Sequence, residues 1–424
     1  MSNASIGWID FSSEHRERVR TVLDLLSVPG VTDELGIRPI LIAFSDRMFP
    51  GISTIQTRAK YFALTAHLIR DYLDKERAKR NPRPFRRYLE QEELQCRIRL
   101  VENGKGRRNL GIIGSDFGTR TDRDVVRRAS SVYWNGLQRF GFVSPDSLSL
   151  AEFGRRVSDD QHRLRTLLEG RGDERGDDND AGQDQWAIRV LAPDKPKHYF
   201  DDLTIDLTAE EADFLRHQIT AHVPQSLLGQ ILAKNARMDQ VRMLQETNSF
   251  EAFAELPFLE ELKDEELRGV VIHARDFWRI LDGAHIRYNC LLQEAGFGNG
   301  ELKDQFEQEW KEWRREIRNF PEAWNTSFLW ATVQRNGTRV RDATRRFVDN
   351  WIEEARAGAP NLERCNELVR RQECSIKLGR ARLRPGKKES VSERIGLNGA
   401  NYRLPVVAQL VRDIYAGERR KSNA

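Results

Sequence analysis

The sequence contains no long apolar run and little cysteine. No stretch approaches the roughly 18 to 20 uninterrupted apolar residues that span a bilayer, and the N-terminus lacks the basic start and apolar core of a secretory signal. The four cysteines show neither CxxC spacing nor the density of a disulfide-stapled domain. We therefore expect free, mostly buried thiols in a cytoplasmic protein that has no membrane partner.

The motifs of nucleotide, metal and hydrolytic chemistry are also missing. Glycine-rich segments lack the spacing of a phosphate-binding loop, and the chain has neither an HExxH nor a GxSxG motif. Its histidines and cysteines are not paired at the close spacing that a zinc site requires. The sequence therefore predicts no catalytic residue, no metal site and no cofactor, and it leaves open whether the protein is an enzyme.

Lysine is scarce among the basic residues, since 14 of the 69 are lysine and the rest are arginine. Arginine binds phosphate in a bidentate manner and stacks on bases, so a polyanionic partner is one interpretation. High genomic GC content, which carries no functional meaning, is the other. Net charge is +8 over residues 1–165, −12 over residues 166–374 and +8 over residues 375–424. The basic ends favour DNA or RNA as a partner.

Helical periodicity dominates the pattern of apolar residues, and it predicts a mainly α, multi-helical protein with two domains and a few short strands. The strongest helices are expected at residues 54–78, 85–100 and 264–295. In the last of these, Trp278 and Leu281 belong to an apolar stripe. Thr208 and Glu211 have the spacing of a capping box at the start of a further helix.

One acidic, polar segment marks the clearest domain boundary. Residues 170–185 read GRGDERGDDNDAGQDQ and contain too little apolar surface to be buried, so we expect a flexible linker there. It separates an N-terminal helical domain, residues 1–169, from a second helical domain, residues 186–374. A basic C-terminal region, residues 375–424, follows.

Residues 86–157 resemble the closing half of a winged-helix domain. A helix predicted at 124–140, with Val126 facing inward, leads into the short apolar strand of RFGFV, a turn, and LSLAEFGRRV. A hairpin of this kind follows the recognition helix in winged-helix proteins. A generic helix–hairpin–helix with no role in DNA binding is the alternative.

Two groups of basic residues are candidate nucleic-acid contacts. Arg127 and Arg128 lie on the predicted helix of the winged-helix-like segment. The run at 377–388 alternates arginine with apolar residues, which would place several guanidinium groups on one side of an extended strand facing a phosphate backbone. Its candidate residues are Lys377, Arg380, Arg382, Arg384, Lys387 and Lys388. A solvated basic loop is the alternative.

Several motifs resemble an uncharacterised bacterial family that is known only as a domain of unknown function. They are GWIDFS at residues 7–12, FPGISTIQTRAKYF at residues 49–62, and shorter segments at 274–289 and 378–383. The resemblance covers almost the whole chain. It implies a cytosolic protein whose relatives lie near helicase-like genes of antiviral defence or DNA metabolism, and it supplies no catalytic residues.

The second motif also suggests an anion site at a helix N-terminus. Hydroxyls and free N–H groups at a helix start, beside an arginine, can bind an anion. With Ile55 and Ala59 facing inward on that helix, the side chains of Gln56, Arg58 and Lys60 would project outward. The candidate anion-binding residues are Ser53, Thr54, Gln56 and Arg58. Helix capping alone is the alternative role of Ser53 and Thr54.

Together these patterns favour a nucleic-acid-binding, non-enzymatic component of a bacterial multi-protein system, with other proteins of that system as further partners. Two alternatives remain. The acidic middle and its Trp-rich helices could form a scaffold that docks a partner protein. A nuclease with an unrecognised metal site is the third hypothesis.

Overall fold

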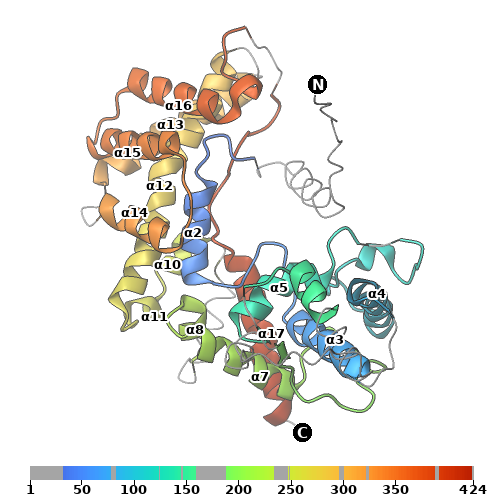
Figure 1. Cartoon of the computed structure of the whole chain (residues 1–424). Coiled ribbons are helices and arrows are strands. Elements are labelled where there is room, and N and C mark those ends of the chain that lie inside the picture. Colours follow the sequence, from blue (N-terminus) through green and yellow to red (C-terminus); the bar gives the residue numbers. More distant parts are fainter. Residues whose placement is uncertain are drawn as a thin grey trace, which may run out of the picture. The chain divides into compact units, whose positions relative to one another are not determined.

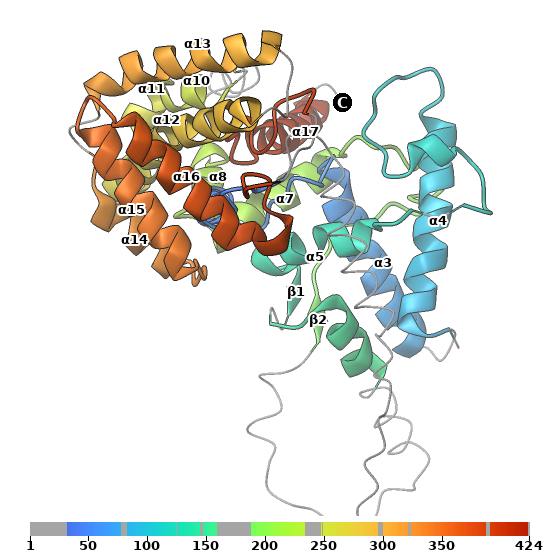
Figure 2. The same ribbon diagram turned by 90° about the horizontal axis from the view of Figure 1, so that it is seen from above.

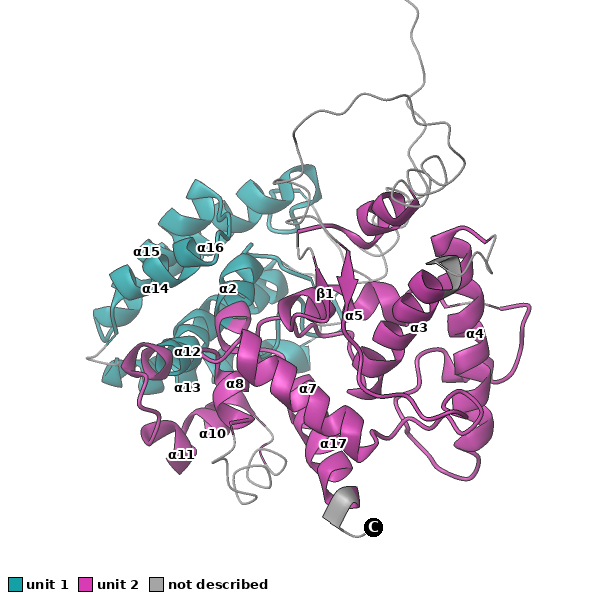
Figure 3. Ribbon diagram, turned by 60° about the horizontal axis from the view of Figure 1, so that its bottom comes forward, with its two compact units in different colours: residues 1–44, 270–400 teal, residues 45–269, 401–424 magenta. Residues whose placement is uncertain are grey.

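The computed structural model describes residues 32–77, 83–123, 125–144, 147–158, 188–233, 247, 249–295, 300–320, 324–386 and 391–422. The GWIDFS motif and the predicted linker at 170–185 lie outside these ranges. The structure is mainly helical, as predicted (Figure 1). Two compact units divide the chain, and Figure 3 colours them separately. Unit 1 comprises residues 1–44 and 270–400, and unit 2 comprises residues 45–269 and 401–424.

This division differs from the domain boundaries that the sequence suggests. Residues on both sides of the predicted linker belong to unit 2. Strand β1 (Val143–Ser144) pairs with β2 (Arg189–Val190), and helix α3 (Lys60–Arg77) packs against α7 (Ala209–His222). Residues 270–374 instead form one unit with most of the basic C-terminal region. Contacts between segments far apart in the sequence, rather than the acidic segment, therefore define the units.

Unit 1 is built around one long helix. Its helices and 3-10 turns, two of the helices extending past the unit boundary, are α2 (Arg38–Met48), α12 (Glu265–Glu294), α13 (Gly300–Glu316), η4 (Ile317–Asn319), α14 (Thr326–Arg335), α15 (Asp342–Arg356), α16 (Leu362–Lys377) and η5 (Leu378–Arg380). The bounds of α12 confirm the helix predicted at 264–295. Asp264 begins it by accepting a hydrogen bond from the Leu267 N–H at 2.9 Å.

The apolar stripe of α12 is buried, as its spacing predicts, including Trp278 and Leu281. Two indole N–H groups from other helices satisfy backbone carbonyls of α12. Trp313 of α13 donates to Arg279 and Trp351 of α15 donates to Ile280, each at 2.8 Å. Figure 2 shows α13 running beside α12. The Trp-rich helices thus build the core of unit 1.

Unit 2 consists of helices and one short two-stranded sheet. Besides β1 and β2 it contains α3 (Lys60–Arg77), α4 (Phe85–Asn103), η1 (Ser115–Phe117), α5 (Ala129–Arg139), α7 (Ala209–His222), α8 (Leu227–Ile231), α10 (Phe250–Ala254), α11 (Pro257–Glu260) and α17 (Leu404–Ser422). Helix α7 packs along the C-terminal helix α17, and α3 packs on α5. The capping box of α7 is confirmed, with Thr208 and Glu211 exchanging hydrogen bonds. No helix within the described ranges is both long enough and apolar enough to cross a membrane.

The helix predicted from residue 54 begins later, at Lys60. The N–H groups of Thr57 and Arg58 donate to the Tyr133 hydroxyl at 2.8 and 3.0 Å, which holds this segment outside a helix. Ala59 is buried as expected, but the orientations expected for Ile55, Gln56 and Lys60 were wrong. Ile55 is 36% exposed, whereas Gln56 and Lys60 are buried.

The helix predicted at 124–140 is also shorter, because α5 begins at Ala129. Glu93 of α4 caps it there by accepting hydrogen bonds from the N–H and hydroxyl of Ser130, at 2.6 and 3.2 Å. Val126 lies before the helix and is 58% exposed, so its predicted inward orientation is wrong.

The hairpin expected within the winged-helix-like segment 86–157 does not form. Val143 pairs with Val190 in an antiparallel bridge, and residues 150–158 are helical. The strand after α5 thus takes its partner from beyond residue 187 rather than from LSL at 148–150. The segment that suggested a wing therefore contributes one strand of two residues to a two-stranded sheet within unit 2.

Candidate nucleic-acid interface

A polar groove in unit 1 lies between α14 and α15. Helix α14 begins where the Asn325 side chain accepts hydrogen bonds from the N–H groups of Ser327 and Phe328, at 2.9 and 3.2 Å. It ends at Gly337, whose φ of +65° is the left-handed conformation that closes a helix. The chain then turns back into α15, so that the two helices form the two walls.

Helix α15 is anchored by one face, which leaves the other exposed. Phe347, Val348, Trp351 and Ile352 are buried in the core of unit 1. Because residues three or four positions apart share a helix face, this anchoring turns Arg345 and Arg346 towards solvent, and both are exposed. Of these two arginines, Arg345 lines the groove.

The groove has a volume of about 1010 Å³ and is open to solvent. Its walls combine a tryptophan, basic and acidic side chains and an amide. Members of this lining include Trp330, Gln334, Arg339, Arg345, Asp349 and Arg356. The indole N–H of Trp330 donates to Asp349 Oδ1 at 2.7 Å. The guanidinium of Arg345 lies over the Trp330 ring, 5.0 Å from its centroid.

Arginine dominates the segment that joins α14 to α15 and contributes Arg339 and Arg345 to the lining of this groove. Residues 335–346 contain five arginines and one acidic residue, Asp342. Four of these arginines are exposed and, within the described ranges, form no ion pair with a carboxylate. We call these four the unpaired arginines: Arg339, Arg341, Arg345 and Arg346. We call the groove, together with these four arginines beside it, the arginine groove.

The basic run predicted at 377–388 has a different environment. Lys377 forms an ion pair with the buried Glu34 at 2.9 Å. The backbone N–H groups of Arg382 and Leu383 donate to the buried carboxylate of Glu373, at 2.5 and 3.1 Å. The described part of the run is therefore a 3-10 turn and a loop folded onto unit 1. The expected extended strand is wrong.

Within that loop the candidate contacts differ in exposure. Arg380 and Arg384 are exposed, and Arg382 is half-buried. Lys387 and Lys388 lie outside the described residues. The alternation of Arg380, Arg382 and Arg384 along one face of a strand is absent, because the chain turns at η5.

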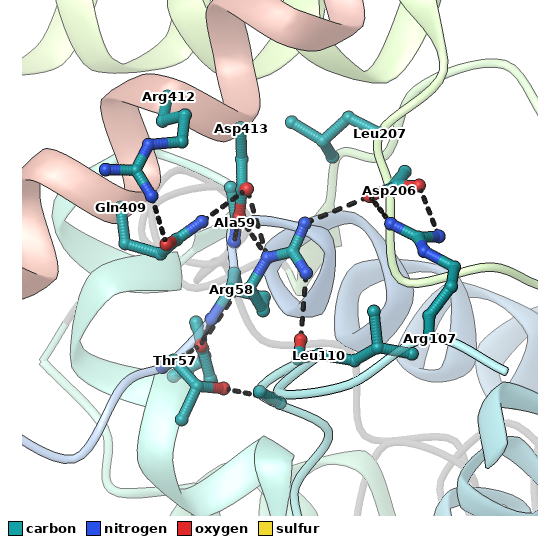
Figure 4. A network of polar contacts seen from close by, with 12 residues as sticks. Thr57, Arg58, Ala59, Arg107, Leu110, Asp206, Leu207, Gln409, Arg412 and Asp413 are labelled. Atoms are coloured by element: carbon teal, nitrogen blue, oxygen red, sulfur yellow. Dashed lines mark hydrogen bonds and ion pairs between the residues drawn. The ribbon is translucent and has the colours of Figure 1, made fainter. Parts of the chain in front are cut away.

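The predicted anion site centres on Arg58, whose guanidinium already binds carboxylates (Figure 4). Its Nε donates to Asp413 at 2.8 and 3.0 Å, and its Nη2 donates to Asp206 at 3.0 Å. Burial alone would lower the pKa of Arg58, but its bonds to the two aspartates raise it. Arg58 thus ties the start of α3 to α17 and to the segment before α7.

The other candidates of the anion site also serve the fold. Gln56 is buried, and its side-chain amide donates to the Gly51 carbonyl at 3.1 Å while its oxygen accepts the Ser53 N–H. Thr54 lies in the turn before α3. The segment does not start a helix, so no free helix N-terminus lies beside Ser53 and Thr54.

Arg127 and Arg128 lie just before α5. Arg128 is half-buried, and its Nη1 lies 3.5 Å from Glu90 Oε1. Arg127 is half-buried as well. Because α5 starts after both residues, neither lies on a recognition helix.

A deeply buried ion pair in unit 2 is a further polar feature that the sequence did not indicate. Lys60 Nζ donates to both oxygens of Glu211 at 2.8 Å, and the Tyr199 hydroxyl donates to the same carboxylate at 2.7 Å. Burial lowers the pKa of Lys60, and the charge of Glu211 partly offsets this effect. The pair joins α3 to α7, and it is a structural contact.

The arginine groove was missed because charge was counted over long segments. Residues 166–374 carry −12 overall, which conceals five arginines within twelve positions. A shorter window over residues 335–346 would have identified the cluster. The tryptophan and the aspartate of the groove could not have been found in this way, since folding brings Trp330 and Asp349 together from different helices.

Comparison with known proteins gives a family and no described function. No curated protein and no solved structure matches the chain. The sequence profile of a family of unknown function, DUF6361, matches residues 2–414. That match confirms the resemblance drawn from the motifs, and the chain belongs to the DUF6361 family.

Proposed function

We propose that the protein binds nucleic acid through the arginine groove. The observation that carries the proposal is the set of four unpaired arginines within residues 339–346, two of which, Arg339 and Arg345, line one open groove. Guanidinium groups that lack carboxylate partners keep their donors for phosphate oxygens, which they bind in a bidentate manner. Each phosphate contact also releases condensed counterions, which favours binding at low salt.

Two alternatives have less support. A scaffold that docks a partner through its Trp-rich helices would need exposed indoles, but Trp310, Trp313 and Trp351 are buried in unit 1, and Trp330 is half-buried in the wall of the arginine groove. A nuclease would need a metal site, and in the described part of the chain no three His, Cys, Asp or Glu side chains lie together as metal ligands. The proposal assigns no catalytic step.

Salt-dependent binding to labelled strands tests the proposal. Fluorescence anisotropy with DNA and RNA strands of about 20 nucleotides, a length that exceeds typical single-domain site sizes, would be measured between about 50 and 200 mM salt. We expect the substitutions Arg339→Ala, Arg345→Ala and Arg346→Ala together to weaken binding at every sequence. They should also reduce the magnitude of the slope of log K against log salt by about 2, because each contact with a single strand contributes about 0.7 to that slope.

A matched control removes three exposed arginines elsewhere in unit 1, with Arg314→Ala, Arg315→Ala and Arg371→Ala. This variant has the same net charge as the groove variant and should keep the wild-type slope. The proposal is wrong if the wild-type protein binds no nucleic acid at low salt, or if both triple variants lose affinity equally.

A further inference from the structure

The arginine groove contains two groups that a phosphate backbone does not need. One is the indole of Trp330, which is half-buried in the wall. The other is the carboxylate of Asp349, which lies 2.7 Å from the indole nitrogen. Neither group would gain from a contact with phosphate, and the carboxylate would repel it. Their presence therefore points to another part of the ligand.

Nucleic-acid bases match both groups. A base stacks on an aromatic ring or on a guanidinium plane, and Arg345 already lies over the Trp330 ring. Carboxylates accept hydrogen bonds from base amino groups, as in recognition of cytosine N4. Asp349 uses Oδ1 for the indole, and its Oδ2 has no hydrogen bond among the described residues. That oxygen can accept from a base.

Base pairing removes the stacking contact. In a duplex both faces of each base are stacked on neighbouring bases, so Trp330 would stack only on an unpaired base, although the cytosine amino group stays accessible in the major groove. The size of the groove agrees with this restriction. Its volume of about 1010 Å³ lies at the upper end of the roughly 300–1,000 Å³ of small-molecule pockets, which suits a few nucleotides of one strand.

We infer that the arginine groove takes a short single-stranded segment whose unpaired base stacks at Trp330 and donates its amino group to Asp349. This inference rests on the proposed function and narrows it. The unpaired arginines hold the phosphates on either side of the stacked base. An acidic peptide fits the groove less well, because its carboxylate side chains have neither a ring to stack at Trp330 nor an amino group to donate to Asp349.

Strand type and base identity give the first test. Anisotropy would compare oligo-dC, oligo-dT and a mixed-sequence duplex of equal length at one salt concentration, with polyglutamate as a competitor. We expect the wild-type protein to bind the single strands more tightly than the duplex, and oligo-dC more tightly than oligo-dT. The preference for oligo-dC follows from the amino group of cytosine, which thymine lacks.

Two substitutions connect this preference to the groove. Trp330→Ala should weaken binding to single strands by roughly 10-fold or more, the range expected for one lost stacking contact. Trp330→Phe should restore most of that loss, which a purely structural role of the indole N–H would not allow. In Asp349→Asn the amide oxygen can keep the bond from the Trp330 indole, and an NH2 donor replaces the free acceptor oxygen, so the preference for oligo-dC should be abolished without weaker binding to oligo-dT. Thermal melting would confirm that each variant is folded.

The outcomes separate the inference from the proposed function. If the duplex binds as tightly as the single strands and Trp330→Ala has no effect, the inference is wrong and the proposed function stands. If polyglutamate displaces oligo-dC at equal charge, the groove is a site for acidic protein segments. If no strand binds to the wild-type protein, both proposals are wrong.

Discussion

Unit 1 contains two arginine-rich segments that differ in what surrounds them. Residues 377–386 lie against buried acids, since Lys377 pairs with Glu34 and two backbone N–H groups bind Glu373. Residues 335–346 instead lie beside an open groove that Arg339 and Arg345 line, and the unpaired arginines have no carboxylate partner among the described residues. The first segment is therefore held against unit 1 by Lys377 and by backbone groups, with Arg380 and Arg384 exposed on a loop, whereas the second segment presents its arginines beside an open groove.

Arg58 in unit 2 is an arginine that serves the fold. Its guanidinium binds two aspartates and the Leu110 carbonyl, and its side chain is 12% exposed. A count of basic residues cannot separate such an arginine from one at the rim of a groove. What separates them is the presence of a carboxylate from a distant part of the chain.

The largest expected effect contrasts a paired arginine with an unpaired one. Arg58→Ala would leave the buried carboxylate of Asp413 without its partner, which costs about 3–5 kcal/mol of unfolding free energy. Arg345→Ala lies on an exposed face and should change the unfolding free energy by no more than about 0.5 kcal/mol. Urea denaturation of the two variants measures both values. Equal losses would remove the distinction between the two roles.

The core of unit 1 gives a second, slightly smaller effect. Leu281→Ala and Trp278→Ala should each destabilise the fold by roughly 2–5 kcal/mol, because both side chains are buried on α12. Nucleic-acid affinity of the folded variants should not change, since neither residue lies in the arginine groove. Denaturation and anisotropy on the same samples would test this separation. Lost affinity in a folded variant would contradict it.

The smallest effect concerns the pH dependence of the Arg58 network. Burial alone would raise the pKa of Asp206, but hydrogen bonds from Arg107 and Arg58 lower it to about 2, below its ordinary value of 3.8. Ionised Asp206 therefore stabilises the fold above about pH 4, and the contribution is lost as the pH falls towards 2. Since the side chain is 20% exposed, we expect a contribution of about 1 kcal/mol or less after solvent screening.

Asp206→Asn isolates this contribution. The stability difference between wild type and variant should be constant from neutral pH down to about pH 5 and should shrink below pH 4. Thermal unfolding across that range measures it. A difference that instead grows as the pH falls would mean that the pKa of Asp206 is not lowered.

Local patterns in the sequence predicted the parts of the fold that local interactions determine. The length and the period of α12 follow from one apolar stripe, and the capping box of α7 needs only Thr208 and Glu211. The start of α3 could not be predicted in this way. The hydroxyl of Tyr133, a residue more than 70 positions further along the chain, accepts hydrogen bonds from the N–H groups of Thr57 and Arg58.

The candidate site likewise has features that the sequence shows and features that only the fold shows. The arginines of residues 335–346 are visible in the sequence, once charge is counted over a short window. Their lack of carboxylate partners is not, because it depends on how α14 and α15 face each other. The pairing of Arg58 with Asp413 across 355 positions is equally invisible.

One measurement compares the two arginine-rich segments directly. The triple variant Arg339→Ala, Arg345→Ala and Arg346→Ala is set against Arg380→Ala, Arg382→Ala and Arg384→Ala, by the salt dependence of binding to a labelled single strand. We predict that the groove variant loses about 2 from the slope of log K against log salt. The second variant should lose less than about 1, since that loop is folded onto Glu373. The opposite order, which the sequence pattern of residues 377–388 alone would favour, would contradict the account.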